Sequence, residues 1–273
     1  MLLTAAIVVL VSCKKNNDAN IIFKIKFDST LPRLDNFGNP STIPSGNSAQ
    51  TPVFNSISAH YIEFAPDMYT PLAEGEIVYT GLQTTAGGSS AVDFSQAIIK
   101  GNDEVFLTVP ISEVAEGTYE WVRVSLTYQN YDIDYLYSGT VYSGSLASFV
   151  GFNTYITDYT VGTENVPINA NKLQGYWGFE TFGTVYQGQA AGTTVPNPIS
   201  STSPIPPGSC VVTGSFPTPL TITGKEKDDI IITLNLSINQ SFEWKDQNAD
   251  GYYEPTAGDT VVDMGLRGLF PEY

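Results

Sequence analysis

An alternation of apolar and polar residues at every second position constrains the fold of this chain more than any other feature. The segment IIFKIKFD places Ile21, Phe23, Ile25 and Phe27 at alternate positions, with lysines between them. Because side chains two residues apart point to the same face of a β-strand, this pattern predicts a strand with one buried face. The segments WVRVSLTY and DIIITLNLSIN repeat the pattern and predict two more such strands.

Further strands are expected along the whole chain, separated by residues typical of turns. They are expected at 60–64, 76–81, 104–109, 155–160, 176–182 and 220–223. In WVRVSLTY the expected buried face holds Val122, Val124, Leu126 and Tyr128. Only 110–121 resembles a helical turn, between Pro110 and Gly117. Many short strands joined by turns predict an all-β fold, and we expect an antiparallel β-sandwich.

The chain divides into a leader, a tether and a β domain. Residues 1–12 are interpreted as a signal peptide, 13–20 as a polar tether, and 21–273 as one β-sandwich domain. Within this domain we expect a long loop rich in Pro, Gly and Ser at 188–219. If that loop were instead a linker, the alternative would be two small β-sandwich domains.

Charge is sparse and strongly acidic. The sequence has 28 acidic and 12 basic residues, for a formal net charge of −16. A chain with so few cations has little to neutralise phosphates, so we expect no nucleic acid as a partner. The same acidity is compatible with binding a cation.

The N-terminus indicates where the protein is located. An apolar run ends in Leu10-Val11-Ser12-Cys13, and the polar tract KKNNDAN follows it. The run is too short to span a bilayer but has the length of a signal-peptide core. These residues resemble the lipobox of bacterial lipoproteins. That resemblance implies cleavage after Ser12, lipid on Cys13, and anchoring to the membrane in the cell envelope, as an outer-membrane lipoprotein.

Few residues are available for nucleophilic or transition-metal chemistry. Lipidation of Cys13 would leave Cys210 without a partner for a disulfide, and we interpret Cys210 as a small buried apolar residue. The single histidine, His60, alternates with Ile62 and Phe64 and is interpreted as a core residue. One histidine and two cysteines exclude zinc or copper sites built from several such ligands.

The segment DQNADGYYEPTAGDTVVD carries the clearest motif. Asp246, Asn248, Asp250 and Gly251 have the spacing of the first half of an EF-hand-type calcium loop. Ligands at alternate positions can surround one cation, and glycine at the sixth position permits a sharp turn. The resemblance implies Ca²⁺ as a structural cofactor bound in a loop at 246–263. The alternative is an acidic turn that binds no metal.

The rest of the ligand set follows the same resemblance with one departure. The backbone of Tyr252 occupies the seventh position and Glu254 the ninth, but the twelfth position is Ala257 instead of a bidentate Glu. Either Asp259 or Asp263 would then complete the shell. The expected metal ligands are Asp246, Asn248, Asp250, Tyr252, Glu254 and Asp259.

Aromatic clusters and carboxylates predict two different functions. Rings suited to stacking on sugars or docking peptides are Tyr131, Tyr135, Tyr137, Tyr142, Tyr176, Trp177 and Phe179, although we place Trp177 and Phe179 in the core. A glycan hydrolase needs only two suitably spaced acids, and the candidates are Glu63, Asp67, Glu113, Glu116, Asp132, Asp134 and Glu180. Asp132 and Asp134 share a face, and an exposed edge strand kept soluble by these acids is the alternative interpretation.

Two further resemblances involve short motifs. Asp28-Ser29-Thr30 and Asp259-Thr260-Val261 resemble the tripeptides that some Bacteroidota O-glycosylate. The segments GEIVYTG and GYWGFE resemble parts of copper-associated MbnP-like β domains. Because the metal motif of that family has no counterpart here, we carry no copper function over.

We therefore expect a lipid-anchored envelope protein with a structural calcium site and a non-catalytic binding or adhesion role. Its partners would be a glycan or a protein, besides the membrane that holds the lipid on Cys13. The alternative is a glycan-acting hydrolase that uses paired carboxylates.

Overall fold

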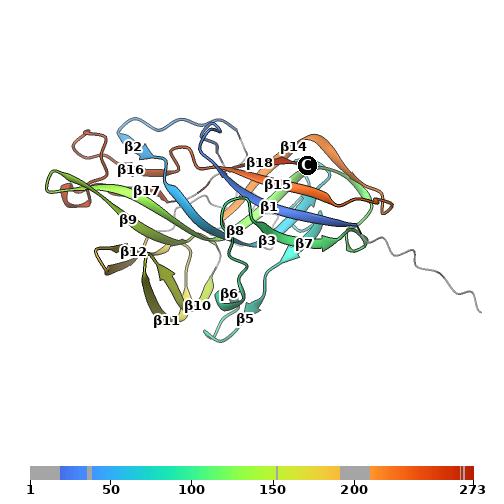
Figure 1. The fold of residues 1–273 in the computed structure, drawn as a ribbon, viewed down its shortest axis with the longest axis horizontal. Coiled ribbons are helices and arrows are strands. Elements are labelled where there is room, and N and C mark those ends of the chain that lie inside the picture. The colour runs from blue at the N-terminus through green and yellow to red at the C-terminus, as the bar shows by residue number, and fades with distance from the viewer. Residues whose placement is uncertain (1–18, 36–38, 152, 191–209, 265, 267) are drawn as a thin grey trace, which may run out of the picture.

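The computed structural model describes residues 19–35, 39–151, 153–190, 210–264, 266 and 268–273, and these fold almost entirely into strands (Figure 1). Three 3-10 turns, at Phe94–Gln96, Ile111–Glu113 and Pro255–Ala257, are the helical elements of the described residues. The all-β prediction is confirmed. The helical turn expected after Pro110 is the second of these 3-10 turns.

Two larger sheets face each other across the main core. The first is a seven-stranded sheet in the order β13-β12-β9-β8-β3-β4, with β14 also paired to β8. The second is a four-stranded sheet in the order β18-β15-β1-β7. Their strands are β1 Asn20–Asp28, β3 Val53–Ala65, β4 Glu76–Thr80, β7 Val105–Pro110, β8 Gly117–Tyr137, β9 Thr140–Phe149, β12 Tyr176–Thr181, β13 Thr184–Gln189, β14 Cys210–Ile222, β15 Ile230–Ser237 and β18 Leu269–Glu272.

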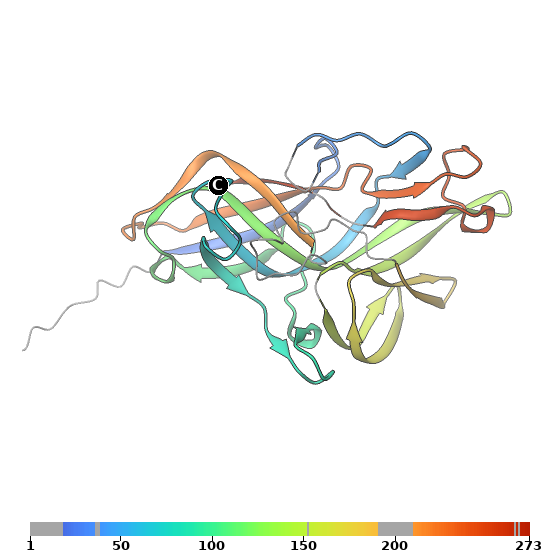
Figure 2. The ribbon, with the colours of Figure 1, turned by 180° about the vertical axis from the view of Figure 1, so that it is seen from behind.

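Two smaller sheets complete the fold (Figure 2). One has the order β11-β10-β6-β5 and the other β17-β16-β2. Their strands are β2 Asn47–Gln50, β5 Gln83–Thr84, β6 Ala91–Asp93, β10 Thr154–Val161, β11 Glu164–Lys172, β16 Phe242–Lys245 and β17 Thr260–Met264. The pairing is mostly antiparallel, but β1 pairs with β15 and β6 with β10 in parallel.

The main core lies between the two larger sheets and follows the predicted alternation. Ile21, Phe23 and Ile25 of β1 are at most 1% exposed, whereas Ile22 and Lys24 between them are partly exposed on the other face. The rings of Phe23 and Phe64 pack with centroids 5.8 Å apart across the sandwich. Burial of these side chains stabilises the fold by roughly 1.5–3 kcal/mol each.

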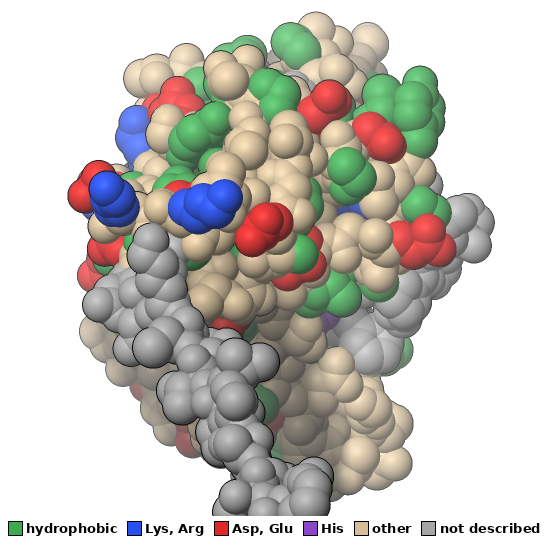
Figure 3. Space-filling view, turned by 90° about the vertical axis from the view of Figure 1, so that its right-hand side faces the viewer, with side chains coloured by type: hydrophobic (Ala, Val, Ile, Leu, Met, Phe, Trp, Pro, Cys, Tyr) green, Lys and Arg blue, Asp and Glu red, His purple; other side chains and the backbone are tan. Residues whose placement is uncertain are grey.

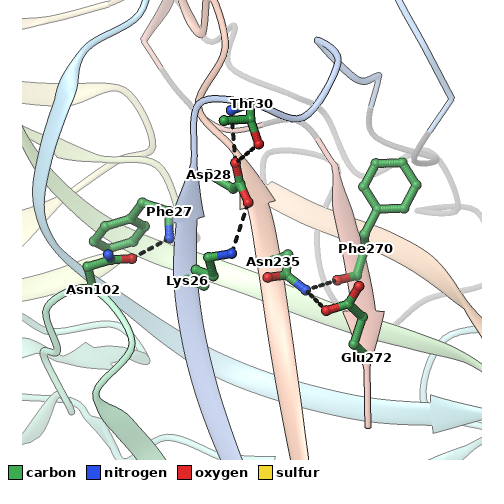
Figure 4. A network of polar contacts seen from close by, with 8 residues as sticks. All are labelled: Lys26, Phe27, Asp28, Thr30, Asn102, Asn235, Phe270 and Glu272. Atoms are coloured by element: carbon green, nitrogen blue, oxygen red, sulfur yellow. Dashed lines mark hydrogen bonds and ion pairs between the residues drawn. The ribbon is translucent and has the colours of Figure 1, made fainter.

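Polar contacts tie the ends of β1 to its surroundings (Figure 4). Asp28 accepts hydrogen bonds from the Thr30 backbone N–H and hydroxyl and pairs with Lys26 at 3.0 Å. The Phe27 backbone N–H donates to Asn102 at 2.7 Å. On the neighbouring strand, the Asn235 amide donates to the carboxylate of Glu272 at 3.1 Å. These contacts help to hold the four-stranded sheet together at its polar face.

A β-bulge in β8 changes which face each residue occupies. Along β3, Ser58 pairs with Tyr128 and Ala59 with Leu126, so Thr127 is the extra residue. Past this bulge the alternation reverses, because one inserted residue moves every later side chain to the opposite face. Tyr128 consequently packs in a second cluster with Phe94 and not with Leu126. The prediction that Tyr128 shares the face of Val122, Val124 and Leu126 is wrong.

Both ends of the expected loop at 188–219 are strand, because β13 runs to Gln189 and β14 starts at Cys210. β14 begins at Cys210, and Cys210–Val212 pair with Leu126–Val124 of β8. The pairing register shifts between Ser215 and Leu220, in the segment that holds Pro217 and Pro219. Proline cannot donate to a ladder but is tolerated where the ladder is interrupted. The loop prediction is therefore wrong for residues 188–189 and 210–219, and residues 191–209 lie outside the described part of the chain.

Candidate functional site

The half of β8 beyond the bulge places its two faces against two different cavities. It pairs with β9 along its whole length, and up to Asp132 it also pairs with β3 on the other side. Tyr128, Asn130 and Asp132 line one cavity, and Ile133 and Tyr135 line the other. The interpretation of this segment as an exposed edge strand is therefore wrong for the residues up to Asp132, which are paired on both sides. Beyond them the strand pairs with β9 alone among the strands that the structure describes.

The second cavity is an aromatic pocket of about 760 Å³. Two hairpins, β8–β9 and β12–β13, form one side of it, and the segment around β16 and β17 forms the other. Its aromatic lining is Tyr135, Tyr137, Trp177, Phe179, Phe182, Tyr186, Phe242 and Tyr253. No Asp, Glu, Lys or Arg lines it among the residues that the structure describes. This volume lies in the range typical of ligand-binding clefts, roughly 300–1,000 Å³.

Ring packing holds the hairpin side of the pocket. Tyr135 packs edge-on against Phe179 at 5.6 Å, and Tyr142 packs edge-on against Phe182 at 5.1 Å. Such pairs are worth about 0.5–1.5 kcal/mol beyond the area that they bury. Trp177 and Phe179 pack against the main core but are only partly buried, so the prediction that they are core residues holds in part. Tyr131 and Tyr176, by contrast, are buried at 1% and 4% exposure.

Both hairpins end in tight two-residue turns beside the pocket. Ser138 and Gly139 connect β8 to β9, and Phe182 and Gly183 connect β12 to β13, all with positive φ. Positive φ at both central residues is the geometry that matches the twist of a hairpin, and Asn or Gly is its usual occupant. Phe182 instead holds a bulky ring at φ 51°, 76% exposed at the pocket rim.

The acidic loop at 246–259 forms part of the opposite wall. Tyr253, Pro255 and Thr256 of this loop line the pocket, followed by Thr260 and Val261 of β17. The Tyr253 ring packs against Phe242 at 5.1 Å, from the core side. In both ribbon views this loop lies at the same end of the molecule as the β8–β9 turn (Figures 1 and 2).

Within the loop, Asp246 closes the first turn. Its carboxylate accepts from the backbone N–H of Asp250 at 3.3 Å and of Gly251 at 2.8 Å, and from the Ser48 hydroxyl at 2.8 Å. Burial opposes ionisation, but these hydrogen bonds outweigh it and hold the pKa of Asp246 below its ordinary value. Gly251 adopts φ 81°, the left-handed turn expected of the sixth position.

Asp259 closes the other end of the loop. Its carboxylate accepts from the backbone N–H of Gln247 at 2.9 Å and of Glu254 at 2.8 Å, and the residue is 7% exposed. Asp263 lies instead in β17, opposite Glu243 of β16. Of the two acids considered for the end of the loop, Asp259 is therefore the one placed in it.

Between these ends, the side chain of Asn248 lies close to the carboxylates of Asp250 and Glu254. The Asn248 amide nitrogen lies 3.1 Å from Asp250 Oδ2 and 3.5 Å from Glu254 Oε2. A Ca²⁺ ion would need the carbonyl oxygen of Asn248 at that place, and rotation of the amide provides it. Tyr252 donates its backbone N–H to Asp250 at 2.9 Å. Among the described residues, no group of three or more His, Cys, Asp or Glu side chains is close enough together to hold a metal ion.

The other predicted residues lie apart from this pocket. Cys13 and the lipobox lie outside the described residues. Cys210 is 1% exposed, and burial raises the pKa of its thiol. His60 is 6% exposed with no partner for Nδ1, and burial lowers its pKa to about 4. Neither residue lines either cavity.

Of the candidate carboxylates, Asp132 is the one that lines either of the two cavities described above. Glu63 is buried and lies 3.7 Å from Arg123. Asp67 caps a turn by accepting from the Tyr69 and Thr70 backbones. Asp132 lines the first cavity together with Asp158, an acid that the sequence analysis did not single out.

Sequence analysis also missed part of the aromatic pocket. Phe182, Tyr186 and Tyr253 were not among the expected binding rings, although all three line it. The segment TFGTVYQGQ contains a usable signal. Its dipeptide Phe182-Gly183 ends in the glycine typical of a two-residue hairpin turn, which predicts that Tyr186 lies on the strand that follows.

The exposed charge does not mark a site on the face that Figure 3 shows. There, acidic side chains are scattered among polar and apolar ones, and basic side chains are few. In the described part of the chain, no helix has the length and apolar character needed to cross a membrane.

Comparison with known proteins adds no relative to these observations. No protein-family model matches the chain, and neither a curated protein nor a solved structure shows significant similarity to it.

Proposed function

We propose that this protein is a non-catalytic binding protein of the bacterial cell envelope, anchored to the outer membrane by lipid on Cys13. The lipobox-like residues and the polar tether after them support the anchor. The acidity of the chain is consistent with a domain that stays in water beside an anionic membrane.

The aromatic pocket is the observation that carries the binding role. It is lined by eight aromatic side chains and lies between two hairpins and a polar loop. Three of its rim residues, Tyr137, Phe182 and Tyr186, are each more than half exposed. Exposed rings around an apolar cavity favour a partner, protein or glycan, that inserts an apolar group.

Calcium has a structural role in this proposal. Oxygen ligands from Asp246, Asn248, Asp250, the Tyr252 carbonyl, Glu254 and Asp259 would hold the ion. The adjacent residues Tyr253, Pro255 and Thr256 line the pocket, so an ion in the loop would stabilise that wall. Extracellular modules of this kind bind calcium at about 10⁻⁴–10⁻³ M.

Binding of the neutral apolar dye N-phenyl-1-naphthylamine tests the pocket directly. We expect dye fluorescence to rise on binding, and the rim substitutions Phe182→Asn and Tyr186→Ser to weaken binding about tenfold. Tyr69→Ser is the matched control, because Tyr69 is 84% exposed and lies outside the pocket. Equal dye binding by all four proteins would contradict a binding role for this pocket.

The second candidate function is a glycan-acting hydrolase. One observation favours it, which is that Asp132 and Asp158 line the same cavity. Asp158 is exposed, however, whereas a general acid of this class is usually buried in apolar surroundings. Release of reducing sugar from a β- or α-linked polysaccharide, abolished by Asp132→Asn, would establish the hydrolase instead.

A further inference from the structure

The first cavity is a polar cleft on the face of β8 opposite the aromatic pocket. Its volume is about 660 Å³, and it lies between β8 and β9 of the main sheet and β10 of a small sheet. The side chains that matter to its chemistry are Asn55, Asn130, Asp132, Ser145, Asp158 and Tyr159. It is separate from the aromatic pocket, since no residue lines both cavities, and it is the cavity that holds Asp132 and Asp158 of the second candidate function.

A network of side-chain hydrogen bonds forms the floor of the polar cleft. Asn55 donates to Asn130 Oδ1 at 3.1 Å and to Asp132 Oδ1 at 3.2 Å. The Ser145 hydroxyl donates to the same Asp132 oxygen at 2.6 Å. Asn130 is 9% exposed and donates to the Tyr128 hydroxyl at 3.2 Å. These contacts fix the orientation of two amides and one carboxylate before any ligand arrives.

The floor retains unused hydrogen-bonding capacity. Asp132 Oδ2 accepts no hydrogen bond from the part of the chain that the structure describes, and neither does Asn55 Oδ1. A carboxylate and an amide that are held side by side can accept from neighbouring hydroxyl groups of one ligand. Ser95 and Thr160 add hydroxyls at the opposite wall.

Apolar side chains complete the walls. Phe94, Tyr128 and Tyr159 line the cleft, and each packs against Phe149 at a centroid distance of 5.0–5.3 Å. All three are at most 7% exposed, so they form a closed apolar wall. Ile99, 41% exposed, lies at the mouth. Rings and aliphatic carbons suit the C–H faces of a sugar, while fixed amides and acids suit its hydroxyls.

The negative charge of the cleft favours neutral sugars over anionic ones. Its described lining contains two carboxylates and no Lys, Arg or His. An anionic ligand would meet like charges there without a compensating cation. We propose that the polar cleft, with Asp132 on its floor, is a binding site for a neutral carbohydrate.

Saturation-transfer NMR and calorimetry on the protein test this proposal. The probes are the methyl pyranosides of glucose, galactose, mannose and N-acetylglucosamine, together with methyl glucuronide and methyl galacturonide. We expect at least one neutral pyranoside to bind. The matching uronide should bind at least tenfold more weakly. For mannose and N-acetylglucosamine, methyl glucuronide serves as the charged comparison. Asp132→Ala is expected to reduce that binding at least tenfold.

Two more variants separate a lost site from a lost fold. Asp134→Ala removes a carboxylate from the same face of β8, but Asp134 does not line the cleft, so binding should be unchanged. Ile99→Trp at the exposed mouth should obstruct the cleft without altering its floor, and should also weaken binding. Failure of every neutral pyranoside to bind, tighter binding of a uronide, or binding unchanged by both Asp132→Ala and Ile99→Trp would overturn the proposal.

Discussion

Leu136 of β8 donates its backbone N–H to the carbonyl oxygen of Tyr253 at 2.7 Å, which joins the β8–β9 hairpin to the acidic loop at 246–259. A second contact lies nearby, where the side chain of Gln50 bonds both the N–H and the carbonyl of Asp134 at 2.8 Å. Both contacts use backbone groups near the end of β8. The first contact connects the proposed calcium loop to a strand that lines the pocket, and the second ties β2 to the same strand. Order in the loop is therefore expected to stabilise the pocket.

Calcium should raise the melting temperature of this protein. With 1 mM Ca²⁺ and a dissociation constant near 0.1 mM, binding adds roughly 1.4 kcal/mol to the free energy of unfolding. For a domain of this size that is a rise of about 3–5 °C. Thermal unfolding in calcium and in excess EDTA measures it, and Asp250→Ala should abolish the difference. Asp263 lies outside the loop, so Asp263→Asn should retain the difference in melting temperature between calcium and EDTA. Identical melting temperatures of the unaltered protein in both solutions would show that the loop is an acidic turn that binds no calcium.

Replacing Phe182 by Asn should stabilise the fold while weakening the pocket. A bulky residue at φ 51° costs roughly 1–2 kcal/mol, whereas Asn tolerates this conformation. Loss of the ring contact with Tyr142 offsets part of the gain, so we expect a net increase of about 0.5–1 kcal/mol in the free energy of urea unfolding. Ser138→Asn, at the equivalent turn position of β8–β9, should stabilise without changing dye affinity. A Phe182→Asn variant that is less stable would show that the ring packing outweighs the strain.

The free energy of unfolding should depend strongly on both residues of the buried ion pair of Arg33 and Glu243. Both side chains are at most 6% exposed, and Arg33 also donates to the Gln240 carbonyl at 2.7 Å. Arg33→Met removes one cation from a buried carboxylate, which also accepts a hydrogen bond from Asn47, and should cost about 3 kcal/mol in urea unfolding.

Removing the second charge should restore much of that loss. We expect Arg33→Met with Glu243→Gln to recover about 2 kcal/mol, because the side chain that lost the arginine is then neutral. The exposed pair of Lys26 and Asp28 is the comparison, and Lys26→Met should cost less than about 1 kcal/mol. Equal costs for Arg33→Met and Lys26→Met would argue against the buried pair as a charge effect.

His60 should make the fold less stable as the solution becomes acidic. Its pKa is lowered by burial from 6.5 to about 4, so between these values the unfolded chain binds a proton that the folded chain does not. Stability is therefore full above pH 6.5 and decreases toward pH 4, by up to about 1.4 kcal/mol per pH unit. Urea unfolding between pH 7 and pH 4.5 measures the slope, which should be shallower in His60→Gln. The same slope in both proteins would assign the effect to other groups.

Local pattern predicted the strands but not the pairing between them. Alternation located the buried face of β1 correctly, because each inward position depends only on a two-residue period. The same rule failed at Tyr128, because the bulge at Thr127 arises where β8 exchanges β14 for β9 as its neighbour. No local feature of WVRVSLTY encodes that exchange.

The candidate sites divide in the same way. The sequence by itself determined the β-rich composition, the acidic loop with its turn at Gly251, and the aromatic character of two hairpins, since these depend on residue type and spacing. Only the tertiary structure decided that Tyr135, Trp177 and Tyr253 line one pocket, and that Asp132 meets Asn55 and Ser145 in another cleft. The physical reason is that most of these residues come from segments far apart in the chain, such as Asn55 and Asp132, or Tyr135 and Tyr253. Their meeting depends on sheet register and on one bulge, which the packing of the whole core selects.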